Sequence, residues 1–514
     1  MNHHKPIDRT RAVGRREVLA CAASMGGAAL AALSGVVSNP ARGSPAGGRK
    51  RPNILWILAE DMSPHFNVYG EKVSTTPWVD RLASEGAIFM NAFVTAPVCS
   101  PSRSAMITGM YQTTIGAHHH RSSRGPVKIH LPKGVRTLPE IFREQGYYVT
   151  NGSAPLPPDR TYTVGKTDYN FEFPKDLYDG TEWSGRKPGQ PFFAQVQLRG
   201  GKFRRPRVWF DQARAPKLVN PDAVRLPPYY PDDPVMRKDW AEYLDSVNYV
   251  DQDVGYILGR LEREGELDNT VVFFWTDHGI AHARGKQFLY EEGIRVPLIV
   301  RAPDRVEKGS IRRDLVAHID IAATSLEFAG IPLPGHLESR PLFGPKAKPR
   351  EYVVTARDRC DETVDRIRSV RTDRYKYIRN YYPDRPLLQP SSYKDGKEIV
   401  QRLRQLHEEG KLNEIQERVL FSPRRPREAM YDLQQDPWEL NDLAGDTGHQ
   451  KKLAELRGIL EGWIKQSGDK GETPEREDAY DGEMQVYLAE LGDARRKITL
   501  QNIETMKRWA REGK

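Results

Sequence analysis

The residue whose surroundings best suit chemistry is Cys99, in the run Cys99-Ser100-Pro101-Ser102-Arg103. Pro101 suits the first turn of a helix, and the residues after it can continue that helix, so the pattern places Cys99 at a helix N-terminus. The backbone N–H groups at such an end favour an anion. Arg103 lies one turn further along the same face, where its guanidinium can reach the same oxyanion. The alternative is a chance pentapeptide with a buried, inert cysteine.

Two short segments that contain Asp or Glu, called here the acidic pairs, begin where apolar runs end. Glu60-Asp61 follows the run 53–58, and Asp277-His278-Gly279 follows the run 270–275. If both runs are parallel strands, their carboxyl ends meet at the edge where open α/β sheets build sites. Taken singly, the first pair could be a turn or a helix N-cap, and the second the start of a loop. Together, and beside the cysteine run, they predict a metal-binding pair.

The pattern Cys-x-Pro-Ser-Arg, followed by Thr108-Gly109, resembles the maturation signature of the sulfatase family. The resemblance implies that Cys99 is oxidised to formylglycine by a formylglycine-generating enzyme, which is then a partner during maturation. The hydrated aldehyde carries two hydroxyl groups. One attacks sulfur and forms a covalent sulfate ester, and the other collapses back to the aldehyde and expels sulfate. A serine or an unmodified cysteine has no second hydroxyl and would stall or never start.

The same family holds one calcium ion between an acidic pair after its first strand and an Asp-Asn or Asp-His pair further along. Carboxylate oxygens are hard ligands that suit calcium. His278 departs from an all-oxygen set, so it could instead face the sulfate or act from outside the ligand set. Carried over to this chain, the resemblance implies one Ca²⁺ with the ligands Glu60, Asp61, residue 99 (Cys99 in the sequence), Asp277 and His278.

Two lysines match segments that line the sulfate pocket in the family. Val164-Gly165-Lys166 matches its Gly-Lys segment, and residues 285–297, with Lys286, match its Gly-Lys … Glu-x-Gly-x-Arg-Val-Pro segment. Fixed cations at these positions would offset the charge that builds on the sulfuryl group and the leaving oxygen. A lone lysine is ordinarily a solvated surface charge, and only the flanking match distinguishes these two.

The leaving-group side departs from the family pattern. Members often have a histidine two residues after the first lysine, where this chain has Asp168, and another after the strand that precedes 198–202, where this chain has none. We expect Lys202 to take at least part of that role. The triplet His118-His119-His120 follows the Cys99 helix, and we expect at least one member, with His120 as our candidate, to face the pocket. The triplet could instead be a metal-binding surface loop, and the acid remains open.

Short continuous apolar runs predict buried parallel strands, and amphipathic helix candidates lie between them. This alternation predicts an α/β fold, a mostly parallel sheet sandwiched by helices, over a catalytic domain at 49–345. The predicted strands are 53–58, 146–150, 191–196, 270–275 and 296–300, and the predicted helices are 78–85, 138–145 and 240–264.

The pattern changes after about residue 345. Residues 352–355, 367–371 and 375–378 alternate in a way that suits an antiparallel sheet with one wet face. The polar segment 390–426 and the charged segment from 453 to the end read as helical. We therefore predict a smaller C-terminal α+β subdomain at 346–514 that contains an antiparallel sheet.

The formal charge of +9 is concentrated in the N-terminal tail. Residues 1–50 hold eight Lys and Arg against two Asp and Glu, which leaves +3 for the rest of the chain and argues against a nucleic-acid partner. Arg15-Arg16, followed by an uncharged stretch rich in Ala and Gly, resembles a twin-arginine export signal. That stretch is about long enough to span a membrane but makes a poor anchor, so we expect no stable membrane insertion. We predict a signal and linker at 1–48 and a periplasmic or secreted protein.

The chain has three cysteines, Cys21, Cys99 and Cys360. Removal of the signal would leave two, which an exported protein would usually join in a disulfide. If Cys99 is consumed by modification, however, Cys360 has no partner within the chain and the mature protein has no disulfide.

Together these residues predict an enzyme that hydrolyses sulfate esters or sulfamates on a sulfated carbohydrate. Residues 60–65 and the Gly-Lys-Thr-Asp context of Lys166 resemble the branch near N-sulfoglucosamine sulfohydrolase (heparan N-sulfatase). The alternatives are a phosphonate or phosphodiester hydrolase of the same superfamily and a non-catalytic binder of sulfated glycans with an unconverted cysteine. The predicted subsite loops 113–130, 199–235 and 380–430 are rich in Arg, Lys, Tyr and His, which suits a polyanionic sugar but also suits plain solvated surface.

Overall fold

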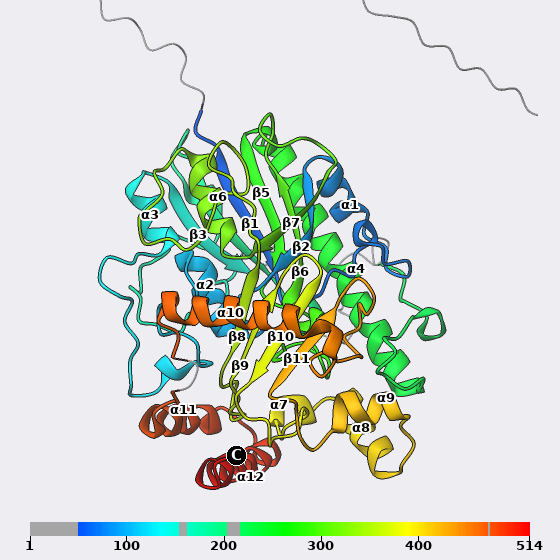
Figure 1. The fold of residues 1–514 in the computed structure, drawn as a ribbon. Helices are drawn as coiled ribbons and strands as arrows, with labels where there is room; N and C mark the ends of the chain where they lie inside the picture. Colours follow the sequence, from blue (N-terminus) through cyan, green and yellow to red (C-terminus); the bar gives the residue numbers. More distant parts are fainter. Residues whose placement is uncertain (1–49, 154–161, 203–215, 471–472) are drawn as a thin grey trace, which may run out of the picture. The chain divides into compact units, whose positions relative to one another are not determined.

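The computed structural model describes residues 50–153, 162–202, 216–470 and 473–514 (Figure 1). Residues 50–514 form one compact unit. The predicted export signal at 1–48 lies outside the described residues, as does part of the predicted subsite loop 199–235. Among the described helices, none has both the length and the apolar character that crossing a bilayer requires.

A seven-stranded sheet, sheet A, lies at the centre of the N-terminal part of the described chain (Figure 1). Its order is β3-β4-β1-β5-β6-β2-β7, and six of its strands run in the same direction, while β6 runs against both of its neighbours. This confirms the mostly parallel sheet predicted from the apolar runs. The strands are β1 (Asn53–Ala59), β2 (Ala87–Phe93), β3 (Tyr148–Ser153), β4 (Phe192–Leu198), β5 (Thr270–Thr276), β6 (Arg295–Arg301) and β7 (Ser310–Ala317).

The prediction that residues 296–300 form a parallel strand is wrong in its direction. These residues lie in β6, which is antiparallel to β5 and β2 and is buried along almost its whole length. The connection from β5 to β6 contains only the four-residue helix α5 (Glu291–Ile294), so the chain returns without the crossover that a parallel strand needs. An unbroken apolar run indicates that a strand is buried on both faces. A central antiparallel strand is buried in this way just as a parallel strand is, so the run does not give the direction of the strand.

Helices cover both faces of sheet A because successive residues of β1 point to opposite sides. Ile54, Trp56 and Leu58 pack in one apolar cluster, and Leu55 and Ile57 pack in another. All three predicted helices are present, as α1, α3 and α4. The first cluster contains residues of α2 (Cys99–Thr108), α3 (Leu138–Glu144) and α6 (Asp320–Ala329), and the second contains residues of α1 (Pro77–Ser84) and α4 (Pro234–Arg263).

A second sheet of four antiparallel strands, sheet B, follows sheet A in the chain. The antiparallel sheet is confirmed, but the expectation of one wet face is wrong, because β8 and β9 are buried at every residue. Helix α10 (Gln450–Ser467) lies across this sheet (Figure 1) and contributes Leu456 and Trp463 to the core, which removes water from that face. The order is β11-β10-β9-β8, with β8 (Val353–Arg357), β9 (Ile367–Arg371), β10 (Tyr375–Asn380) and β11 (Glu428–Asp432).

Short and long helices complete the C-terminal part, as its polar and charged sequence predicted. The remaining helices are α7 (Ser392–Asp395), α8 (Glu398–Glu408), α9 (Glu414–Gln416), α11 (Glu477–Ala489) and α12 (Asp493–Arg511).

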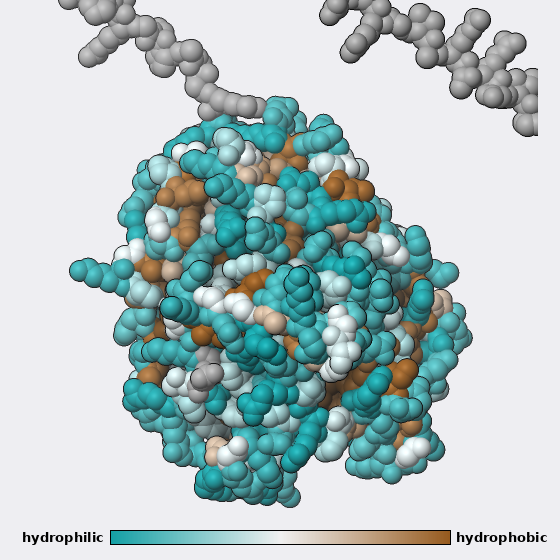
Figure 2. Space-filling model, viewed as in Figure 1, coloured by the Kyte–Doolittle hydropathy of each residue, from teal (hydrophilic) through white to brown (hydrophobic). Residues whose placement is uncertain are grey.

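The face of the molecule in Figure 2 is mostly hydrophilic, and its hydrophobic residues lie in small separate areas. This is the usual surface of a folded protein, because charged side chains stay in water.

Candidate functional site

The carboxyl ends of β1 and β5 bring the two acidic pairs together. The two strands are parallel neighbours with Ala59 opposite Thr276, so Glu60-Asp61 and Asp277-His278 leave the sheet side by side. The backbone N–H of Asp61 donates to Asp277 Oδ1 over 3.2 Å. Asp61 has a φ of 54°, a left-handed conformation that residues with side chains rarely adopt. Such strain persists only where the surroundings impose it, as they do at functional sites.

Cys99 is the first residue of α2, as the sequence predicted, and follows the extended residue Val98. Its Sγ lies 3.1 Å from His278 Nε2 and 3.1 Å from Lys286 Nζ. Burial raises the pKa of the thiol, but the charges of Lys166, Lys286 and His278 outweigh burial and lower the pKa below its ordinary value. A cysteine in such surroundings favours the thiolate, which is the reactive form, so it differs from an inert buried cysteine.

Asp61, Cys99, Asp277 and His278 form a compact group, called here the four-residue group. All four are buried, and their potential ligand atoms lie within 4.8 Å of one another. His278 Nε2 is 3.2 Å from Asp61 Oδ1, and Nδ1 lies 2.9 Å from the carbonyl oxygen of Gly279. A carbonyl oxygen can only accept, so the N–H at Nδ1 donates a hydrogen bond to Gly279, and Nε2 faces the group. Two carboxylates, an imidazole and residue 99 could hold a metal ion here.

The electrostatics of the four-residue group suit a cation. Burial lowers the pKa of His278, but the negative charges of Asp277, Cys99 and Asp61 raise it to about 9. Burial raises the pKa of Asp61, but the cations around it, Lys286 first, lower it below its usual range. The pKa of Asp277 is also lowered, because the charges of His278 and Arg103 outweigh burial. Both carboxylates are therefore ionised at neutral pH, and the same negative field that favours a protonated imidazole favours a bound metal ion.

Glu60 lies outside the four-residue group. Its Oε1 is 2.7 Å from Lys166 Nζ and 3.1 Å from Arg103 Nη2. Arg103 is completely buried and also places Nε 3.1 Å from Asp277 Oδ2 and Nη1 2.8 Å from Gln197 Oε1. The structure therefore places Glu60 against two cations, and it places Arg103 between the two acidic pairs.

Lys166 and Lys286 bring two positive charges to residue 99. Lys286 Nζ is 3.1 Å from Cys99 Sγ and 3.4 Å from Asp61 Oδ1. Burial lowers the pKa of Lys286, but Asp61 and Cys99 raise it well above its ordinary value. The pKa of Lys166 is likewise raised, because Cys99 and Glu60 outweigh burial. Two lysines that keep their charge at a helix N-terminus make an anion-binding pocket.

Lys202 lies at the end of the 3-10 turn η4 (Gly200–Lys202), which follows β4. The side chain of Lys202 is exposed, and its charge contributes to lowering the pKa of Asp61. The turn is fixed against the first acidic pair, because Gly201 N–H donates to the carbonyl of Glu60 over 2.8 Å. A Cβ on Gly200 would lie 2.1 Å from the same oxygen, so only glycine permits this approach.

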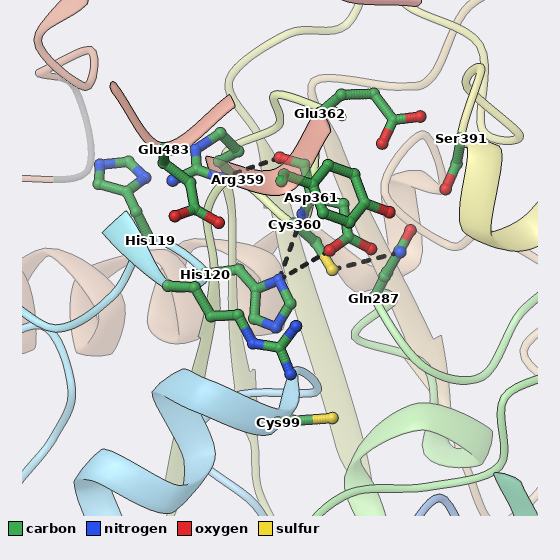
Figure 3. A network of polar contacts seen from close by, with 12 residues as sticks. Cys99, His119, His120, Gln287, Arg359, Cys360, Asp361, Glu362, Ser391 and Glu483 are labelled. Atoms are coloured by element: carbon green, nitrogen blue, oxygen red, sulfur yellow. Dashed lines mark hydrogen bonds and ion pairs between the residues drawn. The ribbon is translucent and has the colours of Figure 1, made fainter. Parts of the chain in front are cut away.

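The histidine triplet diverges after α2, and His120 is the member that lies toward Cys99 (Figure 3). It is buried, its backbone N–H donates to the carbonyl of Arg359, and its Nδ1 lies 3.1 Å from Asp361 Oδ1. His119 turns to the other side, where its Nδ1 is 3.7 Å from Glu475 Oε2. The structure thus brings His120, but not His119, to the side of Cys99.

The position at which the family often has a histidine is occupied by an ion pair. Asp168 Oδ1 and Oδ2 accept from Arg121 Nε and Nη2 over 2.6 and 3.0 Å. Both residues have left-handed backbones, with φ of 52° and 58°. The sequence marked Asp168 as a departure but gave no reason to pair it with Arg121, which lies 47 positions away.

Two further residues of the site were missed. Tyr393, from α7, donates its hydroxyl to Asp61 Oδ2 over 3.1 Å, and its ring lies 4.9 Å from Lys286 Nζ. No local pattern connects α7 with β1. Gln197 lies at the carboxyl end of β4, next to β1, and its place at that edge is a signal that could have found it. Cys99 and Cys360 are both free thiols, and both are buried.

The chain is similar to several known proteins. The family model named Sulfatase matches residues 52–331, and a model described as N-sulphoglucosamine sulphohydrolase, C-terminal, matches residues 278–419. The chain is 33% identical over 474 residues to an ulvan-active sulfatase of Formosa agariphila, across 83% of this chain and 77% of that protein. It is 25% identical over 491 residues to the N-sulphoglucosamine sulphohydrolase of Homo sapiens, across 82% of this chain and 91% of that protein.

A solved structure shows a similar fold. It is described as a complex with its substrate, D-glucosamine-2-N,6-O-disulfate, and it matches with a TM-score of 0.57 at 19% sequence identity. The match covers 82% of this chain and 99% of that one.

Proposed function

Because the chain belongs to the sulfatase family and is a sulfuric ester hydrolase, we propose that it acts on a sulfated carbohydrate, with a formylglycine made from Cys99 as its nucleophile. The bond cleaved is a sulfate ester or a sulfamate. One observation carries the proposal: Cys99 begins α2 and its Sγ lies 3.1 Å from both Lys286 Nζ and His278 Nε2. A sulfuryl group at residue 99 would meet a helix N-terminus and fixed positive charges.

The four-residue group fits a calcium ion through its hard donors. Asp61 and Asp277 supply buried carboxylate oxygens, and His278 supplies Nε2. The thiol of Cys99 is a poor calcium ligand, whereas a formylglycine would supply oxygen, so the two parts of the proposal support each other. A bound Ca²⁺ would stabilise negative charge on oxygens at residue 99. Glu60, with its carboxylate on Arg103 and Lys166, would then fix those cations rather than the metal.

The other side chains have separate tasks in this proposal. Lys166 and Lys286 hold the sulfuryl oxygens, and Arg103 keeps Asp277 and Glu60 in place. Lys202, exposed beside Asp61, is the candidate for the leaving-group side. A formylglycine-generating enzyme is the maturation partner that the conversion requires, and residues 1–48 direct export of the protein.

Conversion and sulfate release test the proposal together. The protein is produced with a formylglycine-generating enzyme, the Cys99 peptide is examined by mass spectrometry, and release is followed over a panel of N- and O-sulfated saccharides. We expect the mass loss of a cysteine converted to an aldehyde. We expect Cys99→Ala to lower sulfate release by at least about 1,000-fold, as loss of a nucleophile does. Cys360→Ala is the matched control and retains activity.

The same experiment separates the alternatives. Full activity of Cys99→Ala would contradict the proposal. Faster hydrolysis of phosphate or phosphonate esters than of sulfate esters would favour a phosphoryl-transfer enzyme of the superfamily. An unconverted Cys99 with retained affinity for sulfated saccharides would identify a binder without activity.

A further inference from the structure

The buried pair His120–Asp361 lies beside Cys99, yet the proposed function gives it no task. Asp361 is in the tight turn between β8 and β9, where Cys360 and Thr363 exchange two backbone hydrogen bonds of 3.0 Å. Its φ of 49° is left-handed, so the turn fixes the direction of its carboxylate. That carboxylate places Oδ1 3.1 Å from His120 Nδ1. The turn at residues 360–363 therefore holds the His120 ring on the side of Nδ1.

The contacts of the ring determine which nitrogen carries a proton. Burial raises the pKa of Asp361, but the contact with His120 and the positive charges of Arg121 and Lys286 lower it below its usual range, so the carboxylate is ionised and can only accept. Burial lowers the pKa of His120 to about 4, so the ring is neutral at pH 7. The backbone N–H of Asp361 also approaches Nδ1, at 3.4 Å, but the nearer and charged acceptor decides. The proton lies on Nδ1, and Nε2 has a free lone pair.

Among the residues that the structure describes, the free nitrogen has no hydrogen-bond partner. Within the described part of the chain, His120 Nε2 is buried and receives no hydrogen bond. Leaving such an atom unpaired is costly, and most buried polar atoms have a partner in the working state of a protein. In Figure 3 the ring lies between the Cys360-Asp361 turn and Cys99, and the edge that carries Nε2 is on the Cys99 side. The missing partner therefore belongs on the side of residue 99, where the proposed function places the sulfated substrate.

We propose that His120 Nε2 accepts a hydrogen bond from an O–H or N–H group of the sugar unit that bears the sulfate. His120 is then a specificity-determining residue, and Asp361, which acts through it, is a positioning residue. The substrate class is a sulfated sugar with a free hydrogen-bond donor next to the sulfated position. This inference rests on the proposed function, because the sugar reaches His120 only when its sulfate occupies the pocket at residue 99.

Three variants separate this role from a structural one. His120→Phe removes both nitrogens but keeps a planar ring. His120→Gln keeps an acceptor oxygen and serves as the conservative variant. Asp361→Asn keeps the shape of the carboxylate, but its amide can donate to Nδ1, which moves the proton to Nε2 and turns an acceptor into a donor.

The kinetic comparison uses two substrates, the saccharide cleaved fastest in the release panel and 4-nitrophenyl sulfate, which has no hydroxyl or amine donor. We expect His120→Phe and Asp361→Asn to lower kcat/KM for the saccharide by about 10- to 100-fold, the loss that follows when a built hydrogen bond is removed. For 4-nitrophenyl sulfate we expect a change below about threefold. We expect His120→Gln to recover part of the loss. Unchanged turnover of the aryl ester also shows that each variant is folded.

A second readout does not depend on activity. Nitrogen chemical shifts of ¹⁵N-histidine-labelled protein, with His120 assigned from the His120→Phe spectrum, report the tautomer. We expect the proton on Nδ1 in the wild type and on Nε2 in Asp361→Asn.

Other results would contradict either the role of His120 or the proposed function on which it rests. A wild-type proton on Nε2, an equal loss on both substrates, or no loss on either would overturn the role of His120 and leave the proposed function standing. A wild-type enzyme that releases sulfate from neither substrate would overturn the proposed function, and this inference with it.

Discussion

At the scale of single residues, Arg103 connects the two halves of the site. The sequence placed it one helical turn after Cys99 and suggested that its guanidinium reaches the substrate oxyanion. In the structure the guanidinium donates to Glu60, Asp277 and Gln197, one residue from each of three neighbouring strand ends. A planar guanidinium can satisfy several acceptors in fixed directions, which an ammonium cannot. Its main task is therefore to order the acidic groups from which the pocket is built.

The first prediction concerns the removal of this charge. Arg103→Met leaves Glu60 and Asp277 buried with one cation fewer, and removal of one partner from a buried charge network costs about 3–5 kcal/mol. We expect the free energy of unfolding, measured in urea, to fall by about that amount, and sulfate release to be lost. Arg424→Met is the control, because the ion pair of Arg424 with Asp384 is exposed and such pairs contribute less than about 1 kcal/mol. Equal stability of the two variants would contradict this account of Arg103.

At the scale of elements, the sequence predicts what depends on local pattern. The positions of β1 and β5 follow from apolar runs, and the acidic pairs at their ends follow from the geometry of parallel strands. The helix start at Cys99 follows from Pro101. These features are local, and together they account for the centre of the site.

The missed features depend on contacts between distant segments. Tyr393 reaches Asp61 across 332 positions, and Asp361 reaches His120 across 241. Both come from the C-terminal part, where the sequence predicted strands, polar helices and a subsite loop at 380–430, but neither of these contacts. The direction of β6 was also missed, because burial of a strand does not encode the direction of its neighbours. Hydrophobic periodicity indicates whether a helix or strand is buried. The two contacts and the direction of β6 depend instead on which elements pack against each other.

One element joins the two sheets, and it carries the next prediction. Glu291, at the start of α5, places Oε1 2.8 Å from Lys376 Nζ of β10 and 3.2 Å from Arg371 Nε of β9. Burial raises the pKa of Glu291, but Arg371, Lys376 and Arg295 lower it to about 2. Because this value is below the ordinary 4.5, the carboxylate stabilises the fold above about pH 4.5, and this stability is lost as the pH falls toward 2.

We therefore expect Glu291→Gln to lower the free energy of unfolding at pH 7 by about 1–3 kcal/mol, and by roughly half as much or less at pH 3. Urea unfolding of wild type and variant at both pH values measures the difference. Glu398→Gln is the matched control, since the ion pair of Glu398 with Lys238 is exposed and contributes about 0–1 kcal/mol. A deficit of equal size at pH 7 and pH 3 would show that the side chain acts through packing and not through its charge.

At the scale of the whole molecule, the distribution of charge separates the tail from the enzyme. Residues 1–50 account for +6 of the formal +9, so the rest of the chain is close to neutral. Ion pairs are consistent with this near-neutral balance. Many arginines and lysines of the described residues lie within 4 Å of a carboxylate, and several of these pairs are buried. We therefore propose that the positive charge of the tail serves a separate task, namely export.

The last prediction tests that task. Changing Arg15 and Arg16 together to lysine keeps the charge and the apolar stretch that follows, but removes the twin arginine that a receptor would read. We expect the variant to accumulate in the cytoplasm of the producing bacterium, while the wild type appears in the periplasm or the medium, as followed by fractionation and immunoblotting. The matched control changes Arg9 and Arg11 to lysine, which alters the same number of arginines in the same tail. If export needs only positive charge ahead of an apolar segment, the two double variants will be exported equally well, and the twin-arginine interpretation fails. Retention of the Arg15/Arg16 variant alone, with its Cys99 peptide still converted, would show that the twin arginine controls location and that residue 99 matures independently of it.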